Sequence, residues 1–372
     1  MVFGNGGPVI ITERWYHSNQ NRDSLGNFST FTTEQNKREV AVMLNRSRFE
    51  SELPREIGMW FPLPKNGEVN FRAAINPEKI AFPDNLLDKL SSYVVECLEK
   101  ISGYSKQSLD GIVVGLSGGI DSSTVAALCK MALKGKRRFL KGIILGRGPL
   151  KKKGEMNDFE YQDVLHAIQT AEDMEIEYQY LDISDVVNSV YSLLGSSGTW
   201  ENSGILPRVR SLLLLQIADN SNAICAGATN GTEALLSAFT AGGPAGHFQP
   251  LVDFYKSEVY KIGEMLGVPD YVRRREPSVS ELGVHDVQLY GVNCYILDPI
   301  LRRMMWQKRS PRATARELGH SLDWLQRIKK LRLEGEKGRR NPPRFVACRT
   351  QAIRIKPNLV WDRSLYFDNL GN

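Results

Sequence analysis

The stretch Gly111-Ile-Val-Val-Gly-Leu-Ser-Gly-Gly-Ile-Asp-Ser-Ser123 decides the fold of this chain. Its apolar run, Ile112 to Val114, is short enough for a buried strand, and a helix-compatible stretch follows from Thr124 to Leu133. Between the two lie glycines and serines, and glycine lets the backbone approach an anion closely because no Cβ intervenes. The stretch therefore predicts a strand, an anion-binding loop and a helix.

The loop has the donors and the carboxylate needed to hold a nucleotide triphosphate. Its N–H groups and those of the first helical turn point at the anion, and the helix dipole favours negative charge there. Asp121 supplies a hard oxygen ligand for Mg²⁺ beside the phosphates. The GK[ST] ending of a Walker A motif is absent. The expected ATP-binding residues of the loop are Gly115, Ser117, Gly118, Gly119, Asp121, Ser122 and Ser123.

The spacing SGGxDS resembles the pyrophosphate loop of the N-type ATP pyrophosphatases. That group activates a carbonyl or carboxyl oxygen as an adenylate and releases pyrophosphate. The alternative is a Gly-Ser turn that precedes a helix and contains an aspartate by chance. Because so many positions fit at a strand-to-helix junction, we predict an ATP site that uses Mg²⁺.

Composition places the chain among ordinary globular proteins. Of its 372 residues, 42% are hydrophobic and 24% are charged, which is typical of a protein with a sizeable core. The net charge of +6 suits an enzyme that handles phosphates and is too small to indicate nucleic-acid binding by itself. The five cysteines are widely spaced without a C-x-x-C pair, which argues against a disulfide framework and a cysteine zinc site. With no long apolar span and no signal-peptide pattern, we expect a cytoplasmic protein without a membrane segment.

Changes in composition and periodicity along the chain predict three segments. They are an N-terminal extension (1–84), a main domain (85–345) and a C-terminal tail (346–372). The extension is expected to be partly β, with a hairpin at Asn66-Gly67. In the main domain, strands over 139–145, 178–181 and 223–226 alternate with helices over 84–101, 159–174, 186–194 and 207–220. This alternation predicts an α/β fold with a doubly wound parallel sheet, whose ligands bind beyond the carboxyl ends of the strands.

Further motifs follow the loop in a fixed order. They are Gly227-Ala-Thr-Asn-Gly-Thr-Glu233, Tyr255-Lys-Ser-Glu-Val259, Arg275-Glu-Pro-Ser278, Leu289-Tyr-Gly291 with Tyr295 and Leu297-Asp298, and Arg339-Arg-Asn-Pro-Pro343. In this order, over roughly residues 84–345, the chain resembles the ammonia-dependent NAD synthetase family. The resemblance implies an adenine nucleotide alpha hydrolase-like (Rossmann-like) fold and a homodimer, with the helix near Pro207–Asn220 as a candidate interface.

The resemblance also implies roles for individual residues. Asp121 and Glu233 would hold Mg²⁺ against the triphosphate. Lys256 would neutralise charge on the α-phosphate as the acyl oxygen attacks, and it would also contact the substrate. The alternatives are that Glu233 is a first-turn carboxylate favoured by the helix dipole, and that Lys256 is a solvated surface lysine.

Other candidate ligands lie in the same motifs. Thr229 is expected to bind ATP. Arg208 and Arg210 fall where the family places an arginine pair near the nucleotide and the substrate, so we assign Arg208 to ATP and Arg210 to the substrate.

The chain departs from the family pattern in the acceptor loops. The family's Gly-Asp-Gly loop and the aspartate that follows it are replaced by residues 240–249, which contain no acid. The family's acidic pair is reduced to His285-Asp286-Val-Gln288, and Ala228 replaces a threonine. We therefore expect a more apolar acceptor lining, made by Pro244, Ala245, His247 and Phe248. His247 is a candidate substrate-binding base, and the alternative is an exposed loop histidine.

Together these features predict an ATP-dependent amide-forming ligase, with Asp121, Lys256 and Glu233 as catalytic residues. It would adenylate a nucleotide-like or other small-molecule carboxylate and transfer ammonia to it. Residues 1–110 leave no room for a glutaminase domain before the loop, and Cys97 lies in an amphipathic stretch, so ammonia would be free or come from a separate protein.

Three alternatives remain open. One is a paralogue that amidates a carboxylate other than deamido-NAD, and the missing loop acids favour it. A second is an ATP-pyrophosphatase-type enzyme that modifies nucleic acid, to which the basic runs 134–138 and 151–153 point, although such runs are usually solvated. The third is a non-catalytic nucleotide-binding protein, against which the retained Asp121 and Glu233 argue.

Overall fold

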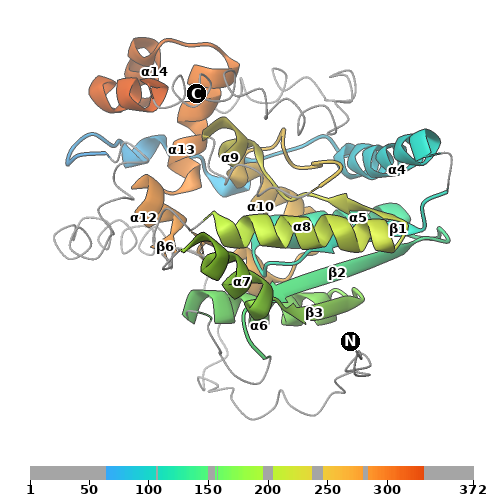
Figure 1. The fold of residues 1–372 in the computed structure, drawn as a ribbon. Helices are drawn as coiled ribbons and strands as arrows, with labels where there is room; N and C mark the ends of the chain where they lie inside the picture. Colours follow the sequence, from blue (N-terminus) through green and yellow to red (C-terminus); the bar gives the residue numbers. More distant parts are fainter. Residues whose placement is uncertain are drawn as a thin grey trace, which may run out of the picture. The chain divides into compact units, whose positions relative to one another are not determined.

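Four parallel strands form the central sheet in the order β3-β2-β1-β4 (Figure 1). They are β1 (Gly111–Gly115), β2 (Phe139–Gly146), β3 (Tyr178–Asp182) and β4 (Ala223–Ala226). The computed structural model describes residues 64–105, 108–149, 156, 158–195, 204–236, 246–279 and 284–330, all within one unit, Glu52–Asn372. The central strand β1 pairs Ile112 with Leu140 on one side and with Ile224 on the other.

The strand order creates a switch point between β1 and β4. From β1 the chain moves outward to β2 and β3, and then crosses back to place β4 on the free side of β1. Ligands of open α/β sheets bind in the crevice at such a point, beyond the carboxyl ends of the strands. The loop after β1 and the loop after β4 therefore meet where a ligand is expected.

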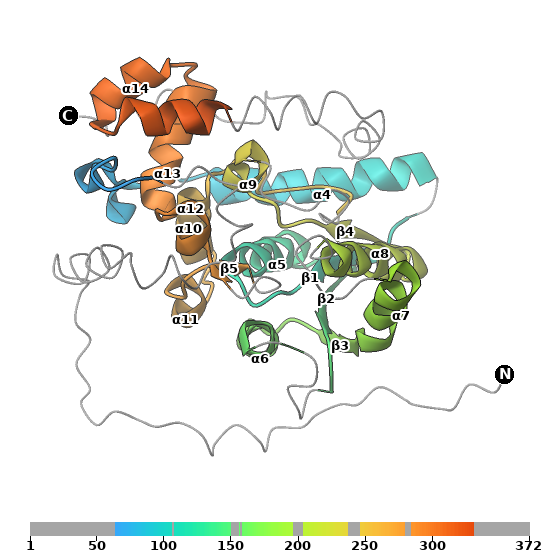
Figure 2. The same ribbon diagram turned by 60° about the vertical axis from the view of Figure 1, so that its left-hand side comes forward.

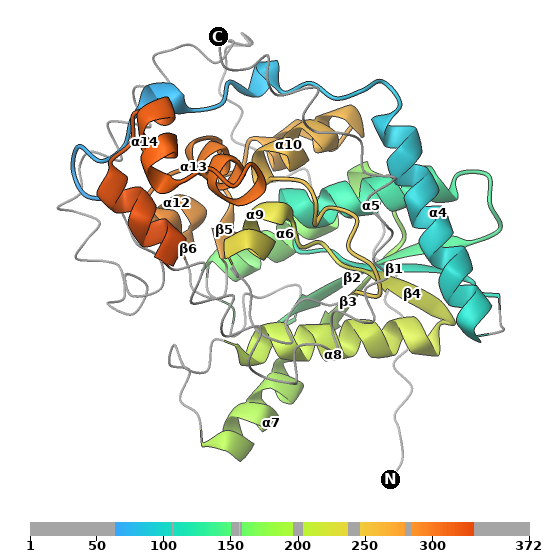
Figure 3. The same cartoon turned by 90° about the horizontal axis from the view of Figure 1, so that it is seen from above.

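Helices cover both faces of the sheet (Figure 3). On one face lie α4 (Leu86–Ser105), α5 (Ile120–Leu133), α6 (Asp158–Asp173), α10 (Lys256–Met265) and α11 (Asp270–Arg273). On the other lie α7 (Ser184–Leu194) and α8 (Ile205–Asn220). Within β1, Ile112 and Val114 are buried in the first core and Val113 in the second, because successive side chains of a strand point to opposite faces. The predicted doubly wound α/β fold is confirmed.

A separate cluster of helices packs beside the carboxyl edge of the sheet. It contains α9 (Gly231–Leu236), α12 (Asp286–Tyr290), α13 (Cys294–Leu301), a π-helical turn (Arg302–Trp306), α14 (Pro311–Leu318) and a last helical stretch, 322–330. The fully buried Trp324 lies in its core. A short antiparallel pair, β5 (Ser278–Val279) and β6 (Val284–His285), precedes α12.

The described end of the N-terminal extension runs along this helical cluster (Figure 2). It contains two short 3₁₀ helices, Phe71–Ala73 and Pro77–Lys79. The Ile75 N–H donates to the Tyr295 carbonyl at 2.9 Å, and Glu68 forms an ion pair with Arg327 at 2.7 Å. Residues 64–84 are thus tied to the C-terminal helices by long-range contacts.

The element boundaries agree closely with the sequence prediction, with one correction. Asn66-Gly67 forms a turn in which Gly67 has φ +78°, but residues 68–70 are not a strand, so the predicted hairpin is wrong. Residues 1–63 of the extension and the tail 346–372 lie outside the described residues. None of the helices in the described ranges has the length and apolar composition needed to span a membrane.

Candidate active site

The loop between β1 and α5 depends on one glycine. Gly118 has φ +76°, and a Cβ added there would lie 2.3 Å from the carbonyl oxygen of Asp163 and 2.9 Å from the backbone nitrogen of Ala167, both in α6. Only glycine satisfies both the backbone conformation and the space. Gly115 has a different role, because its missing Cβ makes room for Leu214 of α8, 2.8 Å away.

Serine hydroxyls close the loop onto itself. Ser122 Oγ accepts a hydrogen bond from the Ser117 N–H at 3.1 Å and lies 3.0 Å from Ser117 Oγ, while Ser123 Oγ donates to the Gly119 carbonyl at 2.8 Å. Ser122 and Ser123 are buried and Ser117 is exposed. Of the three predicted serine donors, Ser117 is therefore the one that faces outward, and the other two shape the loop. No side chain in the described part of the chain caps α5, so the N–H groups of its first turn can bind an anion.

Arg275 fixes the loop from outside, a role that the sequence analysis missed. Its Nη1 donates to the Gly118 carbonyl at 3.4 Å, and its Nη2 forms an ion pair with Asp163. Because the carbonyl of a peptide points opposite to its N–H, this contact turns the Gly119 N–H away from Arg275. The motif Arg275-Glu-Pro-Ser278 was recognised in the sequence, but its distance from the loop along the chain concealed the contact.

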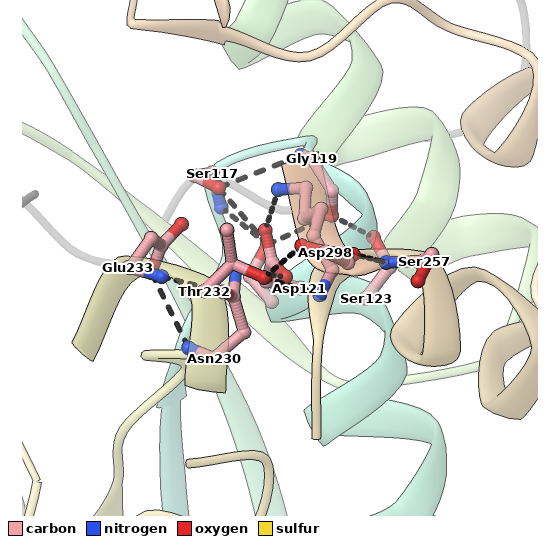
Figure 4. Close-up of polar contacts among 11 residues, drawn as sticks. Ser117, Gly119, Asp121, Ser123, Asn230, Thr232, Glu233, Ser257 and Asp298 are labelled. Carbon is pink, nitrogen blue, oxygen red and sulfur yellow. Dashed lines mark hydrogen bonds and ion pairs between the residues drawn. The ribbon is translucent and has the colours of Figure 1, made fainter. Parts of the chain in front are cut away.

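Two of the predicted catalytic residues, Asp121 and Glu233, lie beside this loop in Figure 4, and an ion pair brings the third, Lys256, to Asp121. Lys256, the first residue of α10, forms an ion pair with Asp121 of α5. Asn230 Nδ2 donates to Asp121 Oδ1 at 3.0 Å, and Asn230 Oδ1 accepts from the Glu233 N–H at 3.0 Å. The Asn230 N–H in turn donates to Glu233 Oε2 at 3.3 Å. Asn230, fully buried, thus links the two carboxylates, although the sequence analysis gave it no role.

The electrostatics of the cluster favour a cation. Burial raises the pKa of Glu233 to about 8, and the charge of Asp121 adds to this shift. Burial opposes protonation of Lys256, but the charges of Asp121, Glu233 and Asp286 raise its pKa well above the ordinary value. Burial also raises the pKa of Asp286. Three carboxyl groups therefore act electrostatically on one ammonium group, and Asp121 contacts it directly.

These residues fit a bound Mg²⁺. Asp121 and Glu233 offer hard oxygen donors, and the cluster has more carboxyl groups than cations, so a divalent ion would offset the excess. Across the described residues no group of three His, Cys, Asp or Glu side chains is arranged to hold a metal. Mg²⁺ is usually held by one or two carboxylates together with phosphates and water.

Asp286 acts electrostatically on the site, a role not assigned to it from the sequence. In the sequence, residues 285–288 look like a reduced form of the family's acidic pair. In the structure the single remaining acid contributes to the pKa shifts of both Glu233 and Lys256. The aspartate in the shortened motif was the available signal.

The two arginines that were predicted to bind ATP and substrate have different environments. Arg210 Nη2 forms an ion pair with Glu160 at 3.1 Å, and Arg147 binds the same carboxylate at 2.6 Å. Glu160 is 1% exposed, so Arg210 takes part in a partly buried cluster beside the end of β2. Arg208 lies exposed in the first turns of α8.

Thr229, expected to bind ATP, follows β4 in the chain, whereas His247, assigned to the acceptor, lies along the outer edge of β4. The Thr229 N–H donates to Gln249 Oε1 at 3.1 Å. The His247 N–H donates to the Cys225 carbonyl at 2.7 Å, and His247 Nδ1 accepts from the Cys225 N–H at 2.9 Å. His247 thus binds β4 through both its backbone and its ring. Its side chain is half-buried, so it is not the exposed loop histidine of the alternative interpretation.

Phe248 does not line an acceptor pocket, which corrects the sequence-based expectation. Its side chain is fully buried in the first core and packs edge-on against Tyr93, with ring centroids 6.2 Å apart. Pro244 and Ala245 lie outside the described residues. Cys97 is also fully buried, and burial raises the pKa of its thiol to about 11, so it is no nucleophile.

The sequence was compared with known protein families and with individual proteins. The model of the family described as NAD synthase matches residues 92–342. The NH(3)-dependent NAD(+) synthetase of Pyrococcus furiosus is 33% identical over 252 residues, which cover 67% of this chain and 92% of the relative. That of Archaeoglobus fulgidus is 34% identical over 200 residues, 53% of this chain and 77% of the relative.

Solved structures share the fold. The NMN synthetase from Francisella tularensis has a TM-score of 0.53 at 22% identity, covering 75% of this chain and 100% of the other. The NAD+ synthetase from Burkholderia pseudomallei has a TM-score of 0.52 at 17% identity, covering 73% and 94%. The family model covers residues 92–342, which include the strands, the loop and the Asp121–Glu233–Lys256 cluster, and the Pyrococcus furiosus relative is 33% identical over 67% of this chain, so the chain belongs to the NAD synthase family.

Proposed function

We propose that this protein is an ATP-dependent ligase that forms amide bonds, with ammonia as the nitrogen donor. One observation carries the proposal: Lys256 and Asp121 form a buried ion pair beside the glycine loop, at the switch point of the sheet. A cation, a carboxylate and an anion-binding helix terminus at one place are the components of a site for MgATP.

In the first step a carboxylate oxygen of the acceptor attacks the α-phosphorus of ATP. The bond from that phosphorus to the bridging oxygen breaks, and an acyl-adenylate and pyrophosphate result. Lys256 would leave Asp121 to stabilise the negative charge that builds up on the α-phosphate, and the α5 N–H groups would hold the phosphate oxygens. Mg²⁺ held by Asp121 and Glu233 would supply further charge neutralisation.

In the second step ammonia attacks the acyl carbon, the C–O bond to the adenylate breaks, and AMP leaves as the new amide loses a proton. The ammonia would be free or delivered by a separate protein, because the buried Cys97 offers no nucleophile for glutamine hydrolysis. We place the reaction in the cytoplasm, where the buried thiols Cys97, Cys129 and Cys225 remain reduced.

Two acceptors are candidates for the carboxylate. Deamido-NAD is the acceptor that the family resemblance implies. A different small-molecule carboxylate is favoured by residues 240–249, which contain no acid where the family pattern has two. A site built to pair with polar groups of its substrate loses orders of magnitude in specificity when those partners are missing.

The test is release of AMP and pyrophosphate by purified protein with ATP and ammonia, comparing no acceptor, deamido-NAD, other small carboxylates and transfer RNA. Pyrophosphate release that requires a small carboxylate is expected, with deamido-NAD below a kcat/KM of about 10⁴ M⁻¹s⁻¹. A higher value would identify an ordinary NAD synthetase. Stimulation by RNA alone would favour the nucleic-acid-modifying alternative.

A homodimer is the assembly we propose, with α7 and α8 at the interface. Leu193 of α7 is 85% exposed and Leu212 of α8 is 64% exposed, which leaves large apolar side chains on adjoining helices. Light scattering after size exclusion is expected to give about twice the chain mass, and Leu212→Glu is expected to shift it towards the monomer. A wild-type monomer at assay concentration would contradict this.

A further inference from the structure

One buried carboxylate outside the proposed chemistry lies where α9 and α10 begin. Asp298, in α13, is 1% exposed. Its Oδ1 accepts a hydrogen bond from the Thr232 hydroxyl at 2.6 Å, and its Oδ2 accepts from the Ser257 N–H at 2.8 Å. Thr232 belongs to α9 and Ser257 to α10, so three helices meet at this group (Figure 4).

Thr232 extends the network to the first residue of α10. Its Oγ1 accepts from the Lys256 N–H at 2.9 Å while its own proton goes to Asp298. The first N–H groups of a helix have no partner within the helix. Here the Ser257 N–H donates directly to Asp298, and the Lys256 N–H donates to the Thr232 hydroxyl, which in turn donates to Asp298. A negative charge at a helix N-terminus is also favourable for the dipole.

The two helices held in this way carry the proposed catalytic residues. Lys256 is the residue whose N–H enters the network, and Glu233 follows Thr232 directly in the chain. The Lys256 side chain leaves the start of α10 to reach Asp121. A small movement of α9 against α10 would therefore shift the ammonium group relative to the carboxylates.

We propose that Asp298 is a positioning residue for the ligase reaction: by binding Thr232 and the Ser257 N–H, it fixes α9 and α10 so that Lys256 and Glu233 face Asp121. This inference rests on the proposed function for its kinetic consequence, whereas its structural consequence can be measured in the free protein. Asp298 lies among apolar neighbours, Leu297, Ile300 and Leu301. Burying a carboxylate costs free energy, and the cost is offset only when its oxygens have hydrogen-bond partners. Packing alone therefore does not explain why an aspartate lies at this position.

The kinetic test compares Asp298→Asn, Thr232→Val and Thr232→Ser. In Asp298→Asn the amide oxygen can still accept from the Ser257 N–H, but the amide N–H then faces the Thr232 hydroxyl, so the Thr232 proton loses its acceptor and the negative charge is removed. We expect kcat for pyrophosphate release to fall about 10- to 100-fold, as for other residues that orient catalytic groups, with the KM for ATP changing much less. Thr232→Val is expected to behave similarly, and Thr232→Ser, which keeps the hydroxyl, to recover most of the lost kcat.

Thr314→Val is the matched control, because Thr314 is fully buried in α14 and its hydroxyl has no hydrogen-bond partner among the described residues. It makes the same substitution at similar burial, and kcat is expected to stay at the wild-type value. Wild-type kcat in Thr232→Val, or no recovery in Thr232→Ser, would overturn the proposal. Asp298→Asn could fail to fold, and the threonine variants then decide.

Amide hydrogen exchange in the free protein separates this inference from the proposed function. Asp298→Asn is expected to speed exchange in peptides covering 228–236 and 255–262, and to leave those covering α5 unchanged. Unchanged exchange at the starts of α9 and α10 would refute the positioning role whatever the activity. Faster exchange in a protein whose wild type releases no pyrophosphate would uphold the positioning role and refute the ligase.

Discussion

Replacing Lys256 by alanine should destabilise the free protein and slow the reaction. The ion pair with Asp121 is largely buried, with the two side chains 8% and 16% exposed. Removing one partner of a buried pair costs about 3–5 kcal/mol, because the other charge is left uncompensated. We take about 3 kcal/mol, since the Asn230 amide still donates to Asp121. At about 2–4 °C per kcal/mol for a domain of 150–250 residues, the melting temperature should fall by about 6–12 °C.

The matched control is Lys261→Ala in the same helix. Lys261 forms an ion pair with Glu264 at 2.7 Å, but the side chains are 28% and 49% exposed. Such surface pairs contribute about 0–1 kcal/mol, so its melting temperature should stay close to wild type. Melting is followed by differential scanning fluorimetry in EDTA, where no metal can replace the missing ammonium group.

Adding Mg²⁺ tests the role of the carboxylates. In the wild type, Lys256 already compensates Asp121, whereas in Lys256→Ala a bound Mg²⁺ would take over that role. Mg²⁺ should therefore raise the melting temperature of Lys256→Ala more than that of wild type. In kinetics, loss of about 2–4 kcal/mol of transition-state stabilisation should lower kcat roughly 30- to 1000-fold. Equal melting of Lys256→Ala and Lys261→Ala in EDTA, or an unchanged response to Mg²⁺, would refute the reasoning.

Three further predictions follow from single contacts. Asp121→Asn should lower pyrophosphate release at least about 100-fold at saturating Mg²⁺ with its circular dichroism unchanged, because an anionic oxygen that we propose binds Mg²⁺ is replaced by a neutral amide. Near wild-type turnover would contradict the assignment. Gly118→Ala should abolish ATP binding in calorimetry, because its Cβ would meet the Asp163 carbonyl at 2.3 Å, whereas Gly135→Ala, at a similar φ of +75° with nothing within 4 Å, should bind normally. Burial lowers the pKa of His320 to about 4. Between pH 6.5 and 4 the histidine of the unfolded chain is protonated while that of the folded chain is not. The free energy of unfolding should therefore have its highest value above pH 6.5 and fall by up to about 3 kcal/mol as the pH is lowered towards 4. Urea titrations in which His320→Asn shows the same loss would exclude His320 as its origin.

The sequence predicted the elements of the sheet well because their signals are local. The strand predicted at 223–226 is β4, and the strand predicted at 139–145 differs from β2 by one residue. Apolar runs of strand length, glycine in the phosphate loop and alternation with helical periods are all readable within a short window. The hairpin at Asn66-Gly67 failed for the complementary reason. The turn formed as its residues require, but the segment after it packs on the C-terminal helices instead of pairing as a strand.

The candidate site was predicted in its residue types and only partly in its contacts. Asp121, Glu233 and Lys256 follow from motifs, and the structure brings them together. Asn230 and Arg275 escaped because each acts on a residue more than a hundred positions away. Phe248 was misassigned because its neighbours in sequence are loop-like, whereas its environment is set by Tyr93 of α4.

The sequence alone determined the local chemistry of this protein: a glycine loop between a strand and a helix, an ordered series of motifs, and the carboxylates and lysine that suit MgATP. These depend on backbone conformation and residue type, which neighbouring residues dictate. Only the tertiary structure decided which groups share a site. The strand order β3-β2-β1-β4 brings the loops after β1 and β4 together. The packing of α13 against α9 and α10 places Asp298 beside the first residues of these two helices. Such contacts arise from packing between distant segments, and packing is fixed by the whole core rather than by any short stretch of the chain.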